Sequence, residues 1–247
     1  MSRWKAATLH SAISTIIALI VALLLFGVWY PPPYFHAAGA DELVLLLVGV
    51  DLAIGPLLTL IVFRTGKRGL KFDLACIGVL QSAALIYGMS VILQSRPVFL
   101  VGALDRFVLV AANEITDDDL AQGPAPAFRS RSWTGPRLVV AELPTDIAER
   151  NNLATQALYG RDVQNMPKYY RTYADGGKTL LGQAKRLDTL GAQKPQFQTA
   201  IGQWLKTSGR DAESVAWLPL EARKASLIML LDARTAQPLG ALAIDPW

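Results

Sequence analysis

Long apolar runs dominate the amino-terminal part of the chain, and shorter apolar runs separated by polar segments make up the rest. The long runs cover residues 6–30, 43–63 and 72–93. A helix needs about 20 mainly apolar residues to cross the roughly 30 Å hydrocarbon layer of a bilayer. The pattern therefore predicts three transmembrane helices within residues 1–94, followed by a water-soluble domain over residues 95–247.

The positive charges of the short loops predict the orientation of these helices. Arg3 and Lys5 precede the first run, and the loop between the second and third runs, residues 64–71, carries four more cations. The loop between the first two runs, residues 31–42, has no Lys or Arg. Because cationic loops stay on the cytoplasmic side, we expect a bacterial inner-membrane protein with a cytoplasmic amino terminus and a periplasmic carboxyl-terminal domain.

A cleaved signal peptide is the alternative for the first run, since Ala38-Gly39-Ala40 resembles a cleavage site. The apolar run is longer than the 7–15 residues of a typical signal peptide, and three prolines and several aromatic residues precede the supposed cut. These features favour a retained anchor. Cleavage would leave the topology of the other two helices unchanged.

The beginning of the outer domain shows strand and helix-start signals. Two apolar runs within residues 97–112 flank Asp105-Arg106 and predict a β-hairpin covered on both faces. Thr116, followed three residues later by an acid, predicts the start of a short helix. Residues 123–136 have loop composition, and residues 137–143 form another predicted strand.

Further along, two helices and three strands are predicted. The spacing of Ile147, Ala154 and Leu158 predicts a helix over residues 146–159, with Gly160 as its end. The second follows Pro195, and its apolar stripe comprises Phe197, Ala200, Ile201, Trp204 and Leu205. The strands cover residues 215–220, 227–231 and 239–244, the last two as a terminal hairpin. Strands at both ends with helices between them predict an α+β domain.

Composition excludes several classes of function. The formal net charge of +4 is shared equally by the membrane part and the outer domain, so neither has a nucleic-acid-binding signature. Cys76 lies in the third apolar run, and His10 and His36 are too scattered for a histidine-based metal site. No nucleophile elbow, phosphate-binding loop or dinucleotide fingerprint occurs. We therefore expect a protein with no catalytic, cofactor-binding or metal-binding residues.

Asp51 is the most informative single residue, because a carboxylate near the bilayer centre costs at least ~2.5 kcal/mol and usually faces protein. Antiparallel helices joined by a short loop bring Gln81 to a similar depth. An internal hydrogen bond between these two side chains is the simpler interpretation. The functional interpretation makes Asp51 a contact for the transmembrane helix of another protein.

Gly55-Pro56 follows Asp51 by one helical turn. Pro56 cannot donate a backbone hydrogen bond to the Leu52 carbonyl, so we expect the helix to bend there. Gly55 permits close contact with a neighbouring helix. A harmless kink is the ordinary explanation, and a groove for a partner helix is the functional one. Asp51, Gly55, Pro56 and Gln81 are thus the candidate partner-contact residues.

Two clusters in the outer domain have ordinary explanations. Asp117-Asp118-Asp119 lacks the ligand spacing and the glycine of a calcium loop, so a helix cap is the better interpretation. Residues 166–170, Met-Pro-Lys-Tyr-Tyr, form an aromatic and cationic cluster. Buried tyrosines with a solvated lysine account for it without a partner.

Several strings in a fixed order resemble one known family. They are residues 49–60 (GVDLAIGPLLTL), 71–75 (KFDLA), 96–99 (RPVF), 105–107 (DRF) and the terminal Pro246-Trp247, and the match begins at Ser2-Arg3-Trp4-Lys5. Together they resemble the TfpX/TfpZ family of type IV pilin accessory proteins over nearly the whole chain. Residues 117–136 match least.

The resemblance implies a non-catalytic inner-membrane protein that assists a cognate type IV major pilin in pilus assembly. Its partners would be that pilin and the lipid bilayer. A membrane-anchored sensor with a periplasmic ligand-binding domain is the alternative, although the two short basic segments leave no cytoplasmic output domain. A membrane enzyme is disfavoured because no acid-base or nucleophile set is present.

Overall fold

A computed structural model describes residues 2–247 of the chain. Within this range the chain forms two compact units. The first unit, residues 2–35 and 39–96, is helical, and the second, residues 36–38 and 97–247, contains a β-sheet with helices. The predicted combination of an apolar helical anchor and an α+β domain is confirmed.

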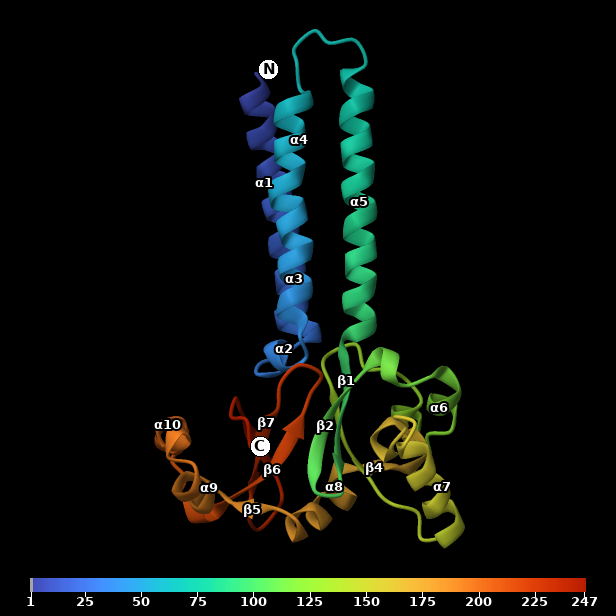
Figure 1. Cartoon of the computed structure of the whole chain (residues 1–247), viewed down its shortest axis with the longest axis vertical. Coiled ribbons are helices and arrows are strands. Elements are labelled where there is room, and N and C mark those ends of the chain that lie inside the picture. Colours follow the sequence, from blue (N-terminus) through green and yellow to red (C-terminus); the bar gives the residue numbers. More distant parts are fainter. Residues whose placement is uncertain (1) are drawn as a thin grey trace. The chain divides into compact units, whose positions relative to one another are not determined.

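Within residues 2–247, three long helices are apolar enough to cross a membrane. The first consists of α1 (Arg3–Leu24) and the π-helical η1 (Leu25–Trp29), the second of α3 (Ala40–Gly49), the π-helical η2 (Val50–Ile54) and α4 (Gly55–Val62), and the third of α5 (Leu70–Ser95). The short helix α2 (Tyr34–Ala37) lies between the first two. Figure 1 shows the long helices running alongside one another.

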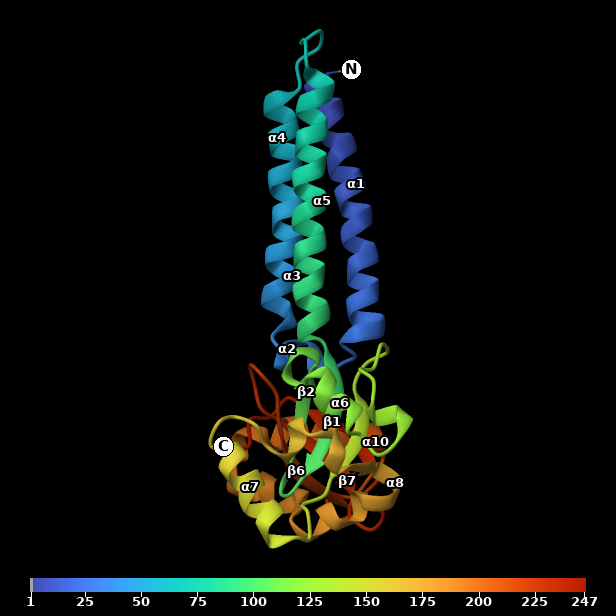
Figure 2. The same cartoon turned by 90° about the vertical axis from the view of Figure 1, so that its right-hand side faces the viewer.

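The second long helix packs against both of the others (Figures 1 and 2). His10 Nδ1 of α1 lies 2.6 Å from Thr59 Oγ1 of α4 and joins the first and second helices by a hydrogen bond. The buried Tyr30 hydroxyl donates to the Ile92 carbonyl over 3.0 Å and joins the ends of the first and third. The rest of α5 is mostly exposed. Its apolar side chains are therefore available to lipid or to another helix.

The second unit is built on a mixed sheet, with eight strands in the described residues. In spatial order these are β4 (Tyr170–Thr172), β3 (Arg137–Ala141), β1 (Pro97–Ala103), β2 (Arg106–Ala111), β6 (Val215–Glu221), β7 (Leu227–Asp232) and β8 (Pro238–Leu242), and β5 (Lys185–Arg186) pairs with β6. The β1–β3 and β2–β6 pairs are parallel, and the others are antiparallel.

The central strands are buried on both faces, which explains their continuous apolar sequences. Every residue of β1 is buried, whereas the edge strands β4 and β8 are partly exposed. The predicted hairpins β1–β2 and β7–β8 both form. The β2–β6 pair covers only the partners Phe107–Leu220 and Val108–Glu221, and it joins the two halves of the sheet.

Helices and short turns connect the strands. The helices are α6 (Asp117–Ala121), α7 (Ile147–Ala157), α8 (Tyr173–Gly176), α9 (Leu187–Gln193) and α10 (Gln198–Ser208). The 3-10 turns are η3 (Ala112–Glu114), η4 (Pro126–Phe128), η5 (Val163–Asn165), η6 (Pro167–Tyr169), η7 (Gly177–Gly182), η8 (Pro195–Phe197) and η9 (Ala212–Ser214). Thr116 caps α6 as predicted, and Asp119 completes the capping box.

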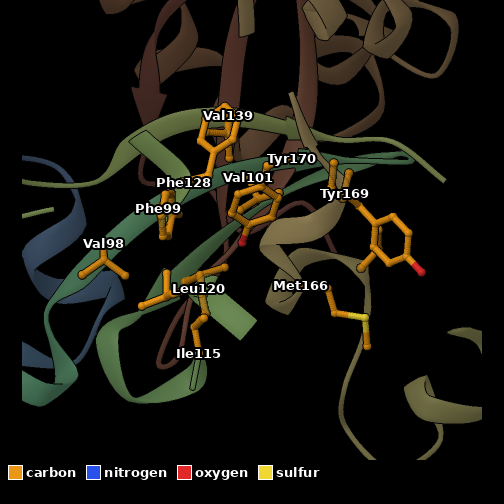
Figure 3. Close-up of a cluster of buried hydrophobic side chains, with 14 of the residues drawn as sticks. Val98, Phe99, Val101, Ile115, Leu120, Phe128, Val139, Met166, Tyr169 and Tyr170 are labelled. Carbon is orange, nitrogen blue, oxygen red and sulfur yellow. The ribbon is translucent and has the colours of Figure 1, made fainter. Parts of the chain in front are cut away.

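Each half of the sheet has its own hydrophobic core. The first core joins β1–β4 to α6 and α7, and the rings of Phe99 and Phe128 each meet the Tyr170 ring edge-on (Figure 3). The second core joins β6–β8 to α9 and α10. There Ile201 is buried, whereas Trp204 is only half-buried. The stripe predicted for α10 therefore packs on the sheet through Ile201, with Trp204 at its margin.

The helix predicted over residues 146–159 forms as α7, but the three apolar residues whose spacing predicts it are not buried. Ile147 and Leu158 are 73% and 85% exposed, and Ala154 is exposed as well. Leu153 is the buried residue of this helix. The spacing of the apolar residues predicts the helix correctly, but the residue that packs into the first core is Leu153, which lies about 100° around the helix from Ala154.

Candidate functional site

Asp51 lies in the π-helical turn η2 in the middle of the second long helix, and its side chain is buried. The cause is in the sequence: Pro56, at the start of α4, has no N–H to donate to the carbonyl four residues earlier. A wider turn accommodates the missing hydrogen bond. The helical irregularity before Pro56 is thus a π-helical turn that contains Asp51.

Gln81 of α5 is the internal partner of Asp51. Its Nε2 atom donates to Asp51 Oδ1 over 3.4 Å and lies 3.5 Å from the Asp51 carbonyl oxygen. Both distances are long for hydrogen bonds, so the contact is a weak one. It is the pair that the depth of the two residues predicted. Within residues 2–247, the second carboxylate oxygen, Oδ2, has no hydrogen-bond partner.

Gly55 and Pro56 are both buried inside the helical unit. A Cβ atom at Gly55 would lie 2.0 Å from Gln81 Nε2, so the glycine provides the space that the Gln81 side chain fills. Asp51, Gly55 and Gln81 are therefore brought together at one place. Pro56 shapes this place through its missing backbone N–H group. The space beside Gly55 is filled by the side chain of Gln81 and is not open to a partner helix.

An open groove lies next to Asp51, between the second long helix and α5. Its volume is about 280 Å³ and its walls are mainly apolar. The residues that line it are Leu43, Leu47, Val50, Asp51, Ala84, Tyr87, Gly88 and Val91. A Cβ atom at Gly88 would lie 2.4 Å from Leu47 Cδ1, so the two helices approach closely here.

Sequence reasoning missed the α5 side of this groove. The signal was available, because Ala84 and Gly88 are small residues four positions apart, the spacing that brings membrane helices into close contact. Asp51, by contrast, was identified from its charge. Together these residues form an apolar groove with one carboxylate in its wall.

The aromatic and cationic cluster at residues 166–170 is an internal network. Tyr169 Oη and Lys168 Nζ donate to Glu149 Oε1 over 2.8 and 3.0 Å. These hydrogen bonds, with that from Tyr169 the larger, lower the pKa of Glu149. Burial raises the pKa of Tyr170.

Among the described residues, no three His, Cys, Asp or Glu side chains come together in a possible metal site.

Comparisons with known proteins place the chain in one family. The family "Fimbrial assembly protein FimB" matches residues 1–39. Two curated proteins of Dichelobacter nodosus, "Fimbrial assembly protein, serogroup E1" and "serogroup I", are 30% and 31% identical to this chain, and each match covers 98% of it and 95% of the relative.

A third relative from the same organism, "Fimbrial assembly protein, serogroups C1 and C2", is 39% identical over 48% of this chain and 92% of its own length. No solved structure matches the chain. Because two relatives at 30% identity or more align with nearly the whole sequence, this chain belongs to the fimbrial assembly protein family.

Proposed function

We propose that this protein assists fimbrial assembly by holding the transmembrane helix of a type IV major pilin in the groove beside Asp51. Within its family we assign it to the TfpX/TfpZ type of accessory protein, on the strings quoted above. It acts without catalysis, from the bacterial inner membrane, with the sheet domain in the periplasm. Its relatives are named as fimbrial assembly proteins, which supports a role in fimbrial assembly.

The proposal rests on one observation: Asp51 lines an apolar groove, and its Oδ2 atom has no hydrogen-bond partner in the part of the chain that the structure describes. Inside a bilayer no water is present to satisfy such an atom, so a partner that supplies a hydrogen bond is favoured. A passing helix can place a polar side chain or terminal group there, whereas an acyl chain cannot. The groove therefore suits a helix with a polar group at the same depth.

Small residues strengthen this proposal. Without a hydrophobic driving force between helices in lipid, association depends on close packing and hydrogen bonds. Ala84 is small and exposed and leaves the α5 side of the groove open to another helix, whereas Gly88 allows Leu47 of the second long helix to pack against α5. The exposed face of α5 continues this surface, because few of its side chains are buried.

Two substitutions of alanine by leucine test the groove. Ala84→Leu fills it, whereas Ala83→Leu adds the same side chain at a neighbouring exposed position that does not line it. The protein is co-expressed with the pilin and purified in detergent, and the pilin retained is measured alongside the number of fimbriae on cells. We expect Ala84→Leu to lose most of the bound pilin and Ala83→Leu to retain it.

Accumulation of both variants at the wild-type level is the control for insertion. If Ala84→Leu retains the pilin and supports normal fimbriation, the groove is not the pilin site. If both variants lose the pilin, the added bulk acts on α5 as a whole, and the assignment to this groove fails.

A further inference from the structure

A second pocket lies in the helical unit, between the start of α1 and the segment that follows α4. It has a volume of about 570 Å³ and is lined by Arg3, Ile61, Phe63, Arg64 and Thr65, which we call the arginine pocket. This volume lies within the ~300–1,000 Å³ range of ligand sites. The pocket plays no part in the pilin groove, because the two share no residue.

The charges at this end of the helices are strongly unbalanced. Six cations lie in residues 2–5 and 64–71, and Asp73 is the acid closest to them in sequence. Asp73 is already paired, since Lys67 Nζ lies 2.6 Å from its Oδ2. Neither Arg3 nor Arg64 makes an ion pair with any residue in the described part of the chain. The pocket thus has two guanidinium groups and no protein anion.

The residue types favour a phosphate group. An arginine fork donates two parallel hydrogen bonds to phosphate oxygens, and two forks in one pocket can hold one phosphate between them. Arg3 is also the first residue of α1, whose amino-terminal end carries a partial positive charge. Ile61 and Phe63 add apolar wall beside the cations.

The position of the pocket indicates where the phosphate comes from. α1 begins at Arg3 and α4 ends at Val62, so the pocket lies where apolar helices end and lipid headgroups begin. Basic pockets between membrane helices at this depth bind anionic headgroups. We propose that the arginine pocket binds the phosphate of an anionic phospholipid, with the first part of an acyl chain against Ile61 and Phe63.

The test compares two double variants of the full-length protein that lose the same charge. Arg3→Gln/Arg64→Gln removes both guanidinium groups of the pocket. The control, Arg68→Gln/Lys71→Gln, removes two cations of the loop at residues 64–71 that do not line the pocket. Binding of phosphatidylglycerol and phosphatidylcholine is measured by native mass spectrometry in a neutral detergent. The wild type should prefer phosphatidylglycerol.

The pocket variant should lose about 30-fold in phosphatidylglycerol affinity, from ~1 kcal/mol for each cation near a headgroup. The control variant should retain nearly all of it. Equal losses in both variants would indicate diffuse attraction and overturn the proposal. Both variants lose two cations, and accumulation at the wild-type level with unchanged helix content by circular dichroism confirms that each is inserted and folded.

A competition arm separates lipid from soluble phosphate. Excess inorganic phosphate should fail to displace phosphatidylglycerol from the wild type, because it has no acyl chain to pack on Ile61 and Phe63. Displacement by inorganic phosphate would assign the pocket to a soluble ligand and overturn the lipid assignment. Arg3→Lys/Arg64→Lys should bind with intermediate affinity, since charge is kept and the forks are lost.

Discussion

Gln81 Nε2 lies 3.4 Å from Asp51 Oδ1, and Gly55, one turn beyond Asp51, leaves the space through which the Gln81 side chain passes. A carboxylate in the middle of an apolar helix is thus held by a residue from another long helix. The contact therefore requires a glycine at position 55 as well as the two polar side chains. Among residues 2–247, the second oxygen of Asp51 has no hydrogen-bond partner.

Gly55→Ala should break this arrangement. The new Cβ would lie 2.0 Å from Gln81 Nε2, so Gln81 must turn away from Asp51. We expect a loss of about 0.6–2 kcal/mol, the range for a hydrogen bond between membrane helices. Thermal unfolding in detergent measures it.

The matched control is Gly49→Ala, because a Cβ at that position of the same helix would meet no described atom within 4 Å other than its chain neighbours and the helix's own backbone. Both changes bring the same gain in helix propensity. A Gly55→Ala variant as stable as Gly49→Ala would show that Gln81 adjusts without cost. In a Gln81→Ala background, Gly55→Ala should cost no more than Gly49→Ala.

The two interpretations of Asp51 predict different behaviour of Asp51→Asn and Asp51→Leu. Asn keeps the shape and the hydrogen-bonding capacity, so pairing with Gln81 alone predicts normal accumulation and normal fimbriation. Asp51→Leu loses that pair at a cost of about 0.6–2 kcal/mol. A role in pilin contact predicts that Asp51→Leu accumulates normally but loses pilin on co-purification. Wild-type level, binding and fimbriation of Asp51→Leu would contradict both interpretations.

Ile201→Ala should destabilise the sheet domain by about 2–5 kcal/mol, because Ile201 is buried in the second core. Trp204→Ala should cost less than the ~3–5 kcal/mol of a fully buried tryptophan, since Trp204 is half-buried. Limited proteolysis of the full chain measures both. Ile147→Ala is the control, because that isoleucine is 73% exposed and should be silent.

Asp232, at the end of β7, should make the stability of the sheet domain depend on pH. The backbone N–H groups of Thr235 and Arg234 donate to Oδ1, and Arg210 donates to Oδ2 over 2.9 Å. These bonds, the one from Thr235 first, lower the pKa of Asp232. Its stabilising effect is therefore complete above the unfolded pKa, near 3.9, and is lost as the pH falls through the lower folded pKa.

Asp232→Asn should accordingly be less stable than the wild type at neutral pH, and the difference should shrink below about pH 4. Thermal unfolding of the full chain across a pH series measures this. Asp118→Asn is the control, since the side chain of Asp118 makes no hydrogen bond among the described residues. A difference that stays constant down to the most acidic pH would argue against charge-assisted bonding at Asp232.

Reporter fusions test the orientation. Since the short-loop cations all fall on one side, a reporter active only in the periplasm should be active after Trp247 and inactive at Gly66. A cytoplasm-active reporter should give the reverse result at both sites. Activity at Gly66 with none after Trp247 would overturn the periplasmic assignment of the sheet domain.

The sequence by itself determined the parts of this protein that depend on one-dimensional patterns. Uninterrupted apolar length identified the long helices, since a bilayer demands about 20 apolar residues. Paired apolar runs identified the β1–β2 and β7–β8 hairpins, because two strands joined by a short turn pair with each other. The Asp51–Gln81 pair followed from depth alone, as a short loop fixes the register of two antiparallel helices.

Tertiary structure decided which face of each element is covered. Ile147, Ala154 and Leu158 of α7 are exposed because Leu153, on a different face, meets the first core. The spacing of apolar residues cannot identify the covered face when the partner is distant in sequence. The groove beside Asp51 and the arginine pocket likewise combine residues from separate helices. Their shape depends on how closely Gly88 and Leu47 approach, and on where α1 begins relative to the end of α4. Such distances arise only when the helices pack.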